Sequence, residues 1–267
     1  MWISRRSVYL SALLGPLLTA AIGICGCGGE GPRSSAQAST LVVSAASSLK
    51  APLERYAAQL HRSAGVTVRY SFAGSDLLAA QIEAGLRPDV FASANLKLPR
   101  RLHARGLVEA AVVFGGNRLV LAVAKGSNEV KALGDLGRHG LTLAVGSPTV
   151  PVGEYTRTVM SRLPPRLRQA AVAAIRDEEP DVAGIVGKLS QGAVDAGFVY
   201  ASDVTAAKGA LRAVAIPASI APAVVYAAAV VKRTGQTAGA RAFIAGLVRG
   251  AGRDALARAG FLAPLRT

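Results

Sequence analysis

The sequence predicts an α/β fold in which helices flank largely parallel sheets, and two observations lead to that prediction. Beyond Thr40 the chain alternates short apolar runs with segments whose apolar residues recur at helical spacing, which is typical of α/β proteins. Hydrophobic residues make up 51% of the chain and charged residues 18%, a balance that indicates a globular chain. We therefore expect the 267 residues to form one large or two medium domains with buried cores.

The expected strands are short apolar runs, and the expected helices carry apolar residues on one face. The strands are predicted at residues 41–45, 66–72, 89–93, 118–124, 141–146, 194–200, 211–215 and 223–231. The helices are predicted at residues 49–62, 76–84, 96–105, 153–162, 165–174, 181–191, 201–207, 237–248 and 252–258. Gly115-Gly116-Asn117 is expected to form a turn, and the acidic run 177–179 a solvated turn. Asp203 is expected to cap the helix that begins beside it.

Two long apolar strands divide the chain into two expected lobes. The strands at 118–124 and 223–231 can carry the chain out of a first lobe and back into it. Lobe 1 would then contain residues 40–117 and 223–267, and lobe 2 residues 118–222. Ligands in such proteins bind between the lobes, at the carboxyl ends of strands.

Residues 1–27 differ from the rest and predict an export signal. Arg5 and Arg6 precede an uncharged apolar stretch over residues 8–24, which is followed by small residues suited to cleavage. A membrane-spanning helix is the alternative, but the stretch is short and contains Gly15-Pro16. The arginine pair also resembles a twin-arginine signal, so the export route stays open.

Both cysteines of the chain lie in the cleavage zone. Ile24 at −3 and Gly26 at −1 predict a lipoprotein-type signal in which Cys27 is lipidated, with a plain cleaved signal as the alternative. The chain beyond Cys27 has no cysteine, which excludes disulfides and thiol chemistry there. Residues 28–39 are rich in Gly, Ser and Ala and are expected to form a flexible tether between a lipid anchor and the domain.

The dispersal of the basic residues argues against nucleic-acid binding, and the absence of catalytic motifs argues against an enzyme. The formal net charge is +15, but the basic residues are dispersed and no aromatic-interleaved basic stripe occurs, so we expect a solvated basic surface. His61, His103 and His139 lie far apart, without the spacing of a metal site. The chain also lacks a Gly-x-Ser-x-Gly elbow and a phosphate-binding loop. We expect no enzyme activity, no cofactor and no metal-cation site.

Two strand-to-helix junctions contain serine, and each predicts a binding position for an anion. The apolar run 41–43 leads through residues 45–48 into a helical pattern, and residues 70–75 repeat this arrangement. The first N–H groups of a helix lack intrahelical partners, and with the positive end of the helix dipole they attract an anion. Taken alone, Ser48 and Ser75 can also be simple helix N-caps, so that alternative stays open.

Four stretches, in order and at compatible spacing, resemble the periplasmic molybdate-binding proteins of ABC transporters. They are residues 45–49, residues 71–75 with 81–85, residues 150–155, and Asp181-Val182 followed by residues 197–203. The resemblance runs from about residue 41 to about residue 264. It implies a two-lobed periplasmic binding-protein fold, each lobe a mostly parallel sheet flanked by helices, with the ligand between the lobes.

The resemblance also implies which residues hold the oxyanion. Ser48 and Ser75 match two serines whose hydroxyl and backbone N–H bind its oxygens. Val152 and Val182 match backbone N–H donors, although Val152 stands where the family has Ala. Tyr200 matches the tyrosine whose phenol closes the pocket. The ion is the transported ligand, not a cofactor.

The function implied is that of the extracytoplasmic substrate-binding component of a molybdate and tungstate ABC importer. Its partners would be the ABC permease and ATPase, with the membrane reached through the lipid anchor, and we expect a monomer. A receptor for another tetrahedral oxyanion, such as sulfate or phosphate, is one alternative. A sensory ligand-binding module is the other.

Overall fold

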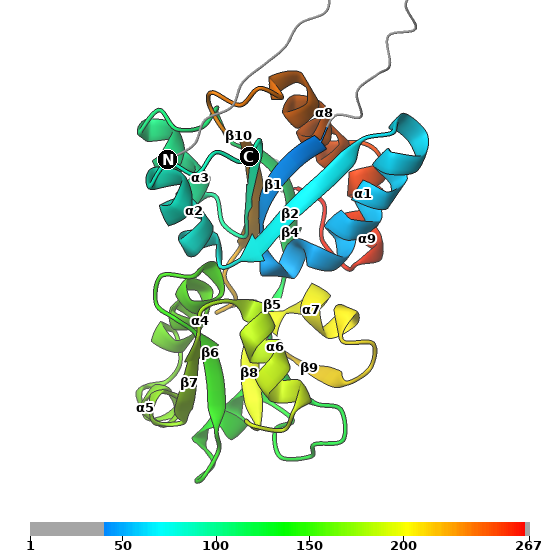
Figure 1. The fold of residues 1–267 in the computed structure, drawn as a ribbon. Coiled ribbons are helices and arrows are strands. Elements are labelled where there is room, and N and C mark those ends of the chain that lie inside the picture. Colours follow the sequence, from blue (N-terminus) through cyan, green and yellow to red (C-terminus); the bar gives the residue numbers. More distant parts are fainter. Residues whose placement is uncertain (1–39, 265–267) are drawn as a thin grey trace, which may run out of the picture. The chain divides into compact units, whose positions relative to one another are not determined.

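The computed structural model describes residues 40–264, which contain two five-stranded sheets covered by helices (Figure 1). The predicted signal at 1–27, with Cys27, and the predicted tether at 28–39 lie outside the described residues. Every predicted strand and helix overlaps an observed element of the same type. Within the described part of the chain, no helix is long and apolar enough to cross a membrane.

The first sheet has the strand order β2-β1-β3-β10-β4. Its strands are β1 (Thr40–Ala46), β2 (Thr67–Ala73), β3 (Val90–Ser93), β4 (Val112–Asn117) and β10 (Val224–Val230). β1 pairs in parallel with β2 and β3, and β10 is antiparallel to β3 and β4. The register joins Ala46 to Ala73, so the carboxyl ends of β1 and β2 lie side by side.

The second sheet has the strand order β7-β6-β8-β5-β9. Its strands are β5 (Leu119–Ala124), β6 (Leu143–Gly146), β7 (Ile175–Glu179), β8 (Ala196–Tyr200) and β9 (Leu211–Ala215). β6 pairs in parallel with β7 and β8, and β5 is antiparallel to β8 and β9. Each sheet is therefore mixed, with one strand, β10 or β5, running against the others.

Helices follow the strands and cover the sheets. They are η1 (Ser47–Leu49), α1 (Lys50–Ala64), α2 (Ser75–Glu83), α3 (Lys97–Ala104), η2 (Leu133–Gly137), α4 (Pro151–Ser161), α5 (Pro165–Ala173), α6 (Val182–Ser190), α7 (Ala201–Ala206), α8 (Thr237–Val248) and α9 (Ala251–Arg258). In α1 the apolar face buries Leu53 and Tyr56, and Gly65 ends the helix in the left-handed conformation, with φ of 65°. Local patterning thus explains both where such a helix packs and where it stops.

Two strands among the described residues were not predicted, and both predicted turns there were wrong. Gly115-Gly116-Asn117 belongs to β4, because Gly116 pairs closely with the chain end: its N–H donates to Leu262 O at 2.9 Å. A Cβ at Gly116 would also lie 3.2 Å from Val224 O, so glycine permits this close backbone approach. The acidic run 177–179 belongs to the edge strand β7, where Arg157 pairs with Glu178 at 2.6 Å. The predicted lobe boundaries, 40–117 with 223–267 and 118–222, stay a prediction.

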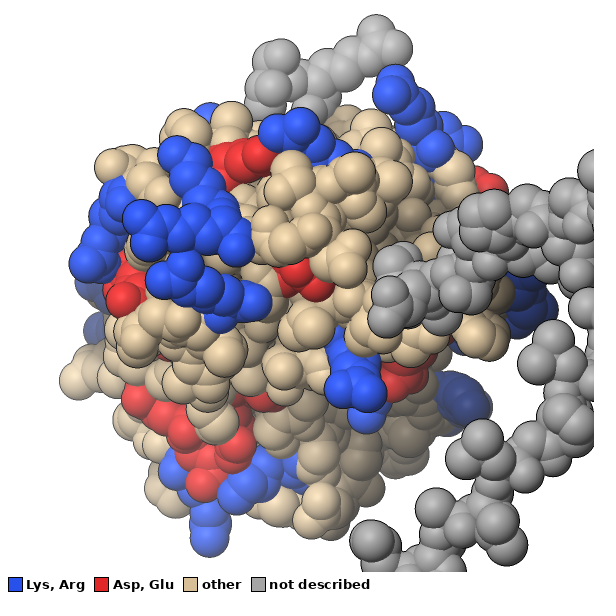
Figure 2. All heavy atoms as spheres, turned by 45° about the horizontal axis from the view of Figure 1, so that its top comes forward, with Lys and Arg blue, Asp and Glu red and all other residues tan. Residues whose placement is uncertain are grey.

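The surface of the described residues carries charges of both signs. Figure 2 shows Lys and Arg side chains spread over one face, with a denser group at one side and acidic side chains among them. Some of these charges are paired: Glu83 lies 3.0 Å from both Arg101 and Arg105, and Arg241 lies 2.6 Å from Glu109. The surface charge is therefore solvated and partly compensated.

Candidate functional site

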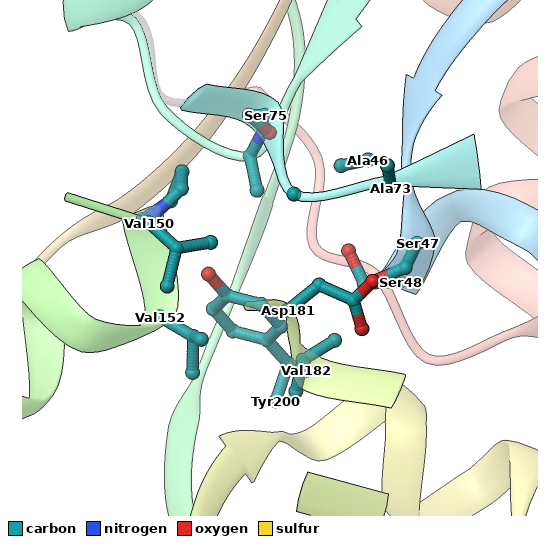
Figure 3. A pocket seen from close by; sticks show the side chains of 13 residues that line it. Ala46, Ser47, Ser48, Ala73, Ser75, Val150, Val152, Asp181, Val182 and Tyr200 are labelled. Carbon is teal, nitrogen blue, oxygen red and sulfur yellow. The ribbon is translucent and has the colours of Figure 1, made fainter. Parts of the chain in front are cut away.

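A small cavity lies where strand ends of the first sheet meet helix starts of the second. It is lined by residues 46–48, 73–75 and Ala94 on the first side and by residues 150–152, 181–182 and Tyr200 on the second. Figure 3 shows these side chains arranged around one common space. The cavity measures about 10 Å³, which is too small for a sugar, a nucleotide or a peptide. The structure brings together all the sequence-predicted ligand residues, which are Ser48, Ser75, Val152, Val182 and Tyr200.

Ser48 lies in the single turn η1 between β1 and α1, and the residue is 9% exposed. Its Oγ is 2.8 Å from the phenol oxygen of Tyr226 on β10. The N-cap of η1 is Ala46, and the N-cap of α1 is Leu49. The simple N-cap alternative for Ser48 is therefore wrong. Its hydroxyl forms a hydrogen bond with a buried side chain, and the residue lines the cavity instead of capping a helix.

Ser75 is the first residue of α2 and is 1% exposed. Gly74 is the N-cap, and the Ser75 Oγ accepts the N–H of Ala94 at 3.1 Å. The N-cap alternative is wrong here too. Because one lone pair of Ser75 Oγ is used by the Ala94 N–H, its own proton remains available to donate into the cavity.

Val152 and Val182 lie in the first turns of α4 and α6, where backbone N–H groups have no intrahelical partner. In α4 the preceding residue is Pro151, which has no N–H, so Val152 provides the first donor after the N-cap. In α6 the Asp181 carboxylate accepts the N–H groups of Ala183 at 2.7 Å and Gly184 at 3.2 Å. That cap leaves the N–H of Val182 for another partner. Both helix starts place positive dipole ends beside the cavity.

Tyr200 ends β8 and supplies the most informative single atom of the site. Its side chain is 1% exposed, and its buried phenol oxygen has no hydrogen-bond partner among the described residues. Burial raises the pKa of Tyr200 well above its usual value, so the phenol keeps its proton and acts as a donor. A buried donor without an acceptor is costly, and a bound acceptor at this position would remove that cost.

Asp203 is the third residue of α7, whose N-cap is Tyr200, so it supports the start of this helix from inside the first turn and not as the N-cap that the sequence predicts. Its Oδ2 accepts the Tyr200 N–H at 2.9 Å. Burial raises the pKa of Asp203 to about 7, although the bond from Tyr200 lowers it. This carboxyl therefore holds the backbone that carries the Tyr200 ring.

The donors around the cavity are electrically neutral. None of the described residues that line it is Lys, Arg or His, and Asp181 is the charged one. Its carboxylate is bound to the amides of α6, where the helix dipole stabilises it. An anion in this cavity would therefore meet hydroxyls, amides and helix dipoles instead of formal positive charge.

Contacts around the rim join the segments on the two sides of the cavity. Thr149 Oγ1 donates to Asp76 Oδ2 at 2.5 Å, and Tyr155 OH donates to Ala94 O at 3.3 Å. Gly74 approaches the opposite segment so closely that a Cβ there would lie 2.4 Å from Pro180 O. Glycine at this position therefore permits the close approach of the two segments.

Sequence reasoning missed one polar contact of the site, the phenol of Tyr226. Tyr226 lies in the middle of an apolar strand, and it meets Ser48 across 178 positions of the sequence. Its chain neighbours carry no polar pattern that marks it. A tyrosine in an otherwise apolar strand is the only local signal, because a phenol needs a buried partner.

Comparisons with known proteins place this geometry in context. The family model described as "Bacterial extracellular solute-binding protein" matches residues 41–262. A protein from Mycobacterium tuberculosis named "Molybdate-binding protein ModA" is 34% identical over 271 residues, which cover 98% of this chain and 99% of that protein.

Two solved structures share the fold. The periplasmic molybdate-binding protein of Azotobacter vinelandii superimposes with a TM-score of 0.75 at 24% identity, covering 84% of this chain and 100% of the other. The sulfate-binding protein SubI of Mycobacterium tuberculosis superimposes with a TM-score of 0.71 at 16% identity, covering 84% and 86%. At these identities the likeness concerns the fold alone. It confirms the predicted two-lobed α/β architecture.

Proposed function

This chain belongs to the bacterial extracellular solute-binding protein family, and from this premise we propose that it is the substrate-binding component of a molybdate ABC importer. The name of the Mycobacterium tuberculosis relative, which matches nearly the whole chain, supports molybdate as the ligand. The permease and the ATPase of the importer are its partners. Tungstate, which has nearly the size of molybdate, is the second ion that it binds.

The observation that carries the proposal is the buried Tyr200 phenol without a partner, in a cavity whose other donors are also neutral. Each of these donors needs an acceptor oxygen. They are the hydroxyls of Ser48, Ser75 and Tyr200 and the backbone N–H groups at the helix starts. A fully deprotonated tetrahedral oxyanion such as molybdate supplies four acceptor oxygens and no competing proton, whereas hydrogen phosphate carries a proton. Fixed neutral donors select by distance and by protonation state, which formal positive charges would not do.

The energies of these bonds are sufficient for tight binding. A hydrogen bond to a charged group contributes roughly 1.5–3 kcal/mol. About seven donors would surround the proposed ion, namely the three hydroxyls and the backbone N–H groups of Ser48, Ser75, Val152 and Val182. Their sum offsets much of the cost of dehydrating the anion. A submicromolar Kd, which corresponds to about −8 kcal/mol or better, is then within reach.

The protein acts outside the cytoplasm, held as a monomer at the membrane by a lipid on Cys27. The export signal and the Gly/Ser/Ala-rich tether of the sequence support this anchoring. Labelling with a fatty-acid analogue should mark the wild-type protein and not Cys27→Ala. If Cys27→Ala remains labelled and membrane-bound, the lipid lies elsewhere.

Ligand identity is tested by equilibrium dialysis of the purified, ion-depleted protein against molybdate, tungstate, sulfate and phosphate. We expect one molybdate or tungstate per chain at submicromolar free ion, and no retention of sulfate or phosphate at equal concentration. Val152→Ala is a matched control, since the proposed contact is the backbone N–H and the affinity should not change. Retention of sulfate in preference to molybdate would identify a receptor for a different oxyanion. Retention of none of these ions would favour a sensory module with another ligand.

A further inference from the structure

The hydroxyl of Ser48 is held by a residue that does not itself line the cavity. Tyr226 on β10 is 0% exposed, and its phenol oxygen lies 2.8 Å from Ser48 Oγ. Ser48 lines the cavity, whereas Tyr226 lies behind it. The two hydroxyls therefore form a buried pair with one member facing the ion site.

The direction of this hydrogen bond decides what Ser48 presents to an anion. Each hydroxyl has one proton to donate. If Ser48 donated to Tyr226, only lone pairs of Ser48 would face the cavity, and these repel an anion. If Tyr226 donates to Ser48, the Ser48 proton is free to point at an oxyanion oxygen.

The surroundings of Tyr226 favour its role as the donor. Burial raises the pKa of Tyr226 well above its usual value, so the phenol stays protonated. Among the described residues, Ser48 Oγ is the hydrogen-bond partner of this phenol, so the phenol proton has no other acceptor there and is donated to Ser48.

The ring of Tyr226 is fixed by aromatic neighbours. Its centroid lies 5.1 Å from that of Phe261, 5.8 Å from that of Tyr200 and 6.2 Å from that of Phe114, all in edge-on arrangements. A ring packed in this way cannot turn its hydroxyl elsewhere. Its phenol is preorganised toward Ser48.

We propose that Tyr226 is a positioning residue of the oxyanion site, whose phenol donates to Ser48 Oγ and thereby commits the Ser48 proton to the bound ion. This inference rests on the proposed oxyanion-binding function. The hydroxyl of the second serine, Ser75, is oriented in the same way by the Ala94 N–H, which donates to Ser75 Oγ at 3.1 Å. The Ser75 hydroxyl is thus oriented by a main-chain N–H, and the Ser48 hydroxyl by a side chain that substitution can remove.

The test is a double-mutant cycle of Tyr226→Phe and Ser48→Ala, with molybdate affinity measured by calorimetry. Phenylalanine keeps the packed ring and removes the donor. We expect Tyr226→Phe to weaken molybdate binding about 3- to 12-fold in the wild-type background and less than about twofold in the Ser48→Ala background. The unfolding temperature gives a second readout. Ser48→Ala leaves the Tyr226 phenol unpaired, so adding Tyr226→Phe should restore part of the lost stability.

Tyr56→Phe is the matched control, because Tyr56 is also buried and its phenol donates to Phe243 O at 3.2 Å, away from the cavity. It should lower stability without changing affinity. Wild-type affinity in Tyr226→Phe, or an equal loss in both backgrounds, would overturn the positioning role. Failure of the wild-type protein to bind molybdate would instead overturn the proposed function, which keeps the two outcomes distinct.

Discussion

Replacing Tyr200 with Phe should weaken ion binding without weakening the fold, because its buried phenol has no hydrogen-bond partner among the described residues. The ring packs edge-on against Tyr155 and Tyr226 at centroid distances of 6.4 and 5.8 Å, and phenylalanine keeps that packing. The substitution therefore removes one buried donor and little else. This separates binding from stability more cleanly than truncation to alanine.

The expected magnitudes follow from the state of that oxygen. A hydrogen bond to a charged group contributes roughly 1.5–3 kcal/mol, so molybdate affinity should fall about 10- to 150-fold. A buried donor left unsatisfied costs about 1–3 kcal/mol, so its removal should leave the free energy of unfolding of the ion-free protein unchanged or raise it by up to that amount. The two effects have opposite signs.

Calorimetric titration measures the first quantity, and urea unfolding of the ion-free protein measures the second. Tyr56→Phe should show the reverse pattern, since its satisfied bond to Phe243 O contributes to stability and not to binding. The reasoning would be refuted if Tyr200→Phe bound molybdate as tightly as the wild type. It would also be refuted if the ion-free variant unfolded at a markedly lower urea concentration.

The remaining predictions concern the serines, a rim glycine and a buried carboxyl. Ser48→Ala and Ser75→Ala should each weaken molybdate binding about 10- to 150-fold by calorimetry; a lower melting temperature with unchanged affinity would show a purely structural role. Gly74→Ala should weaken binding roughly 5- to 150-fold, because its Cβ would lie 2.4 Å from Pro180 O and push apart the two segments that line the cavity; wild-type affinity would show that the ion-bound protein does not need this close approach. The raised pKa of Asp203, about 7, means that the folded state holds this proton between about pH 4 and pH 7 while the unfolded state releases it. The free energy of unfolding should therefore fall as pH rises through that window, by up to roughly 4 kcal/mol, and stay level above it. Urea unfolding of Asp203→Asn should lack this fall, and a fall equal to that of the wild type would contradict the assignment.

The sequence predicted most of the fold because its elements are set by local patterns. Amphipathic spacing located helices such as α1, and apolar runs located the central strands such as β1 and β8. Of the two missed strands, β7 lacks such a run, and β4 begins with an apolar run at residues 112–114 but continues through Gly115-Gly116-Asn117, which is typical of a turn. β7 is an acidic edge strand whose charges are paired by side chains such as Arg157. The glycines of β4 allow neighbouring backbone to approach closely, and local sequence does not reveal that contact.

The candidate site was predictable where it depends on the chain's immediate neighbours. A serine at a strand-to-helix junction marks Ser48 and Ser75 from sequence alone. Val152 and Val182 carry no side-chain signal, since their proposed contribution is a backbone N–H, and only the motif resemblance singled them out. Tyr226 could not be predicted, because the contact with Ser48 depends on the packing of β10 against η1 and not on local sequence.

A crystal structure of the molybdate complex, with the molybdenum located by anomalous scattering, tests most directly whether neutral donors hold the ion. We predict a single strong peak in the cavity, with oxyanion oxygens at hydrogen-bond distance from Ser48 Oγ, Ser75 Oγ and Tyr200 Oη and from the N–H groups of Val152 and Val182. A peak bound by Lys or Arg on the surface, with the cavity empty, would contradict the account.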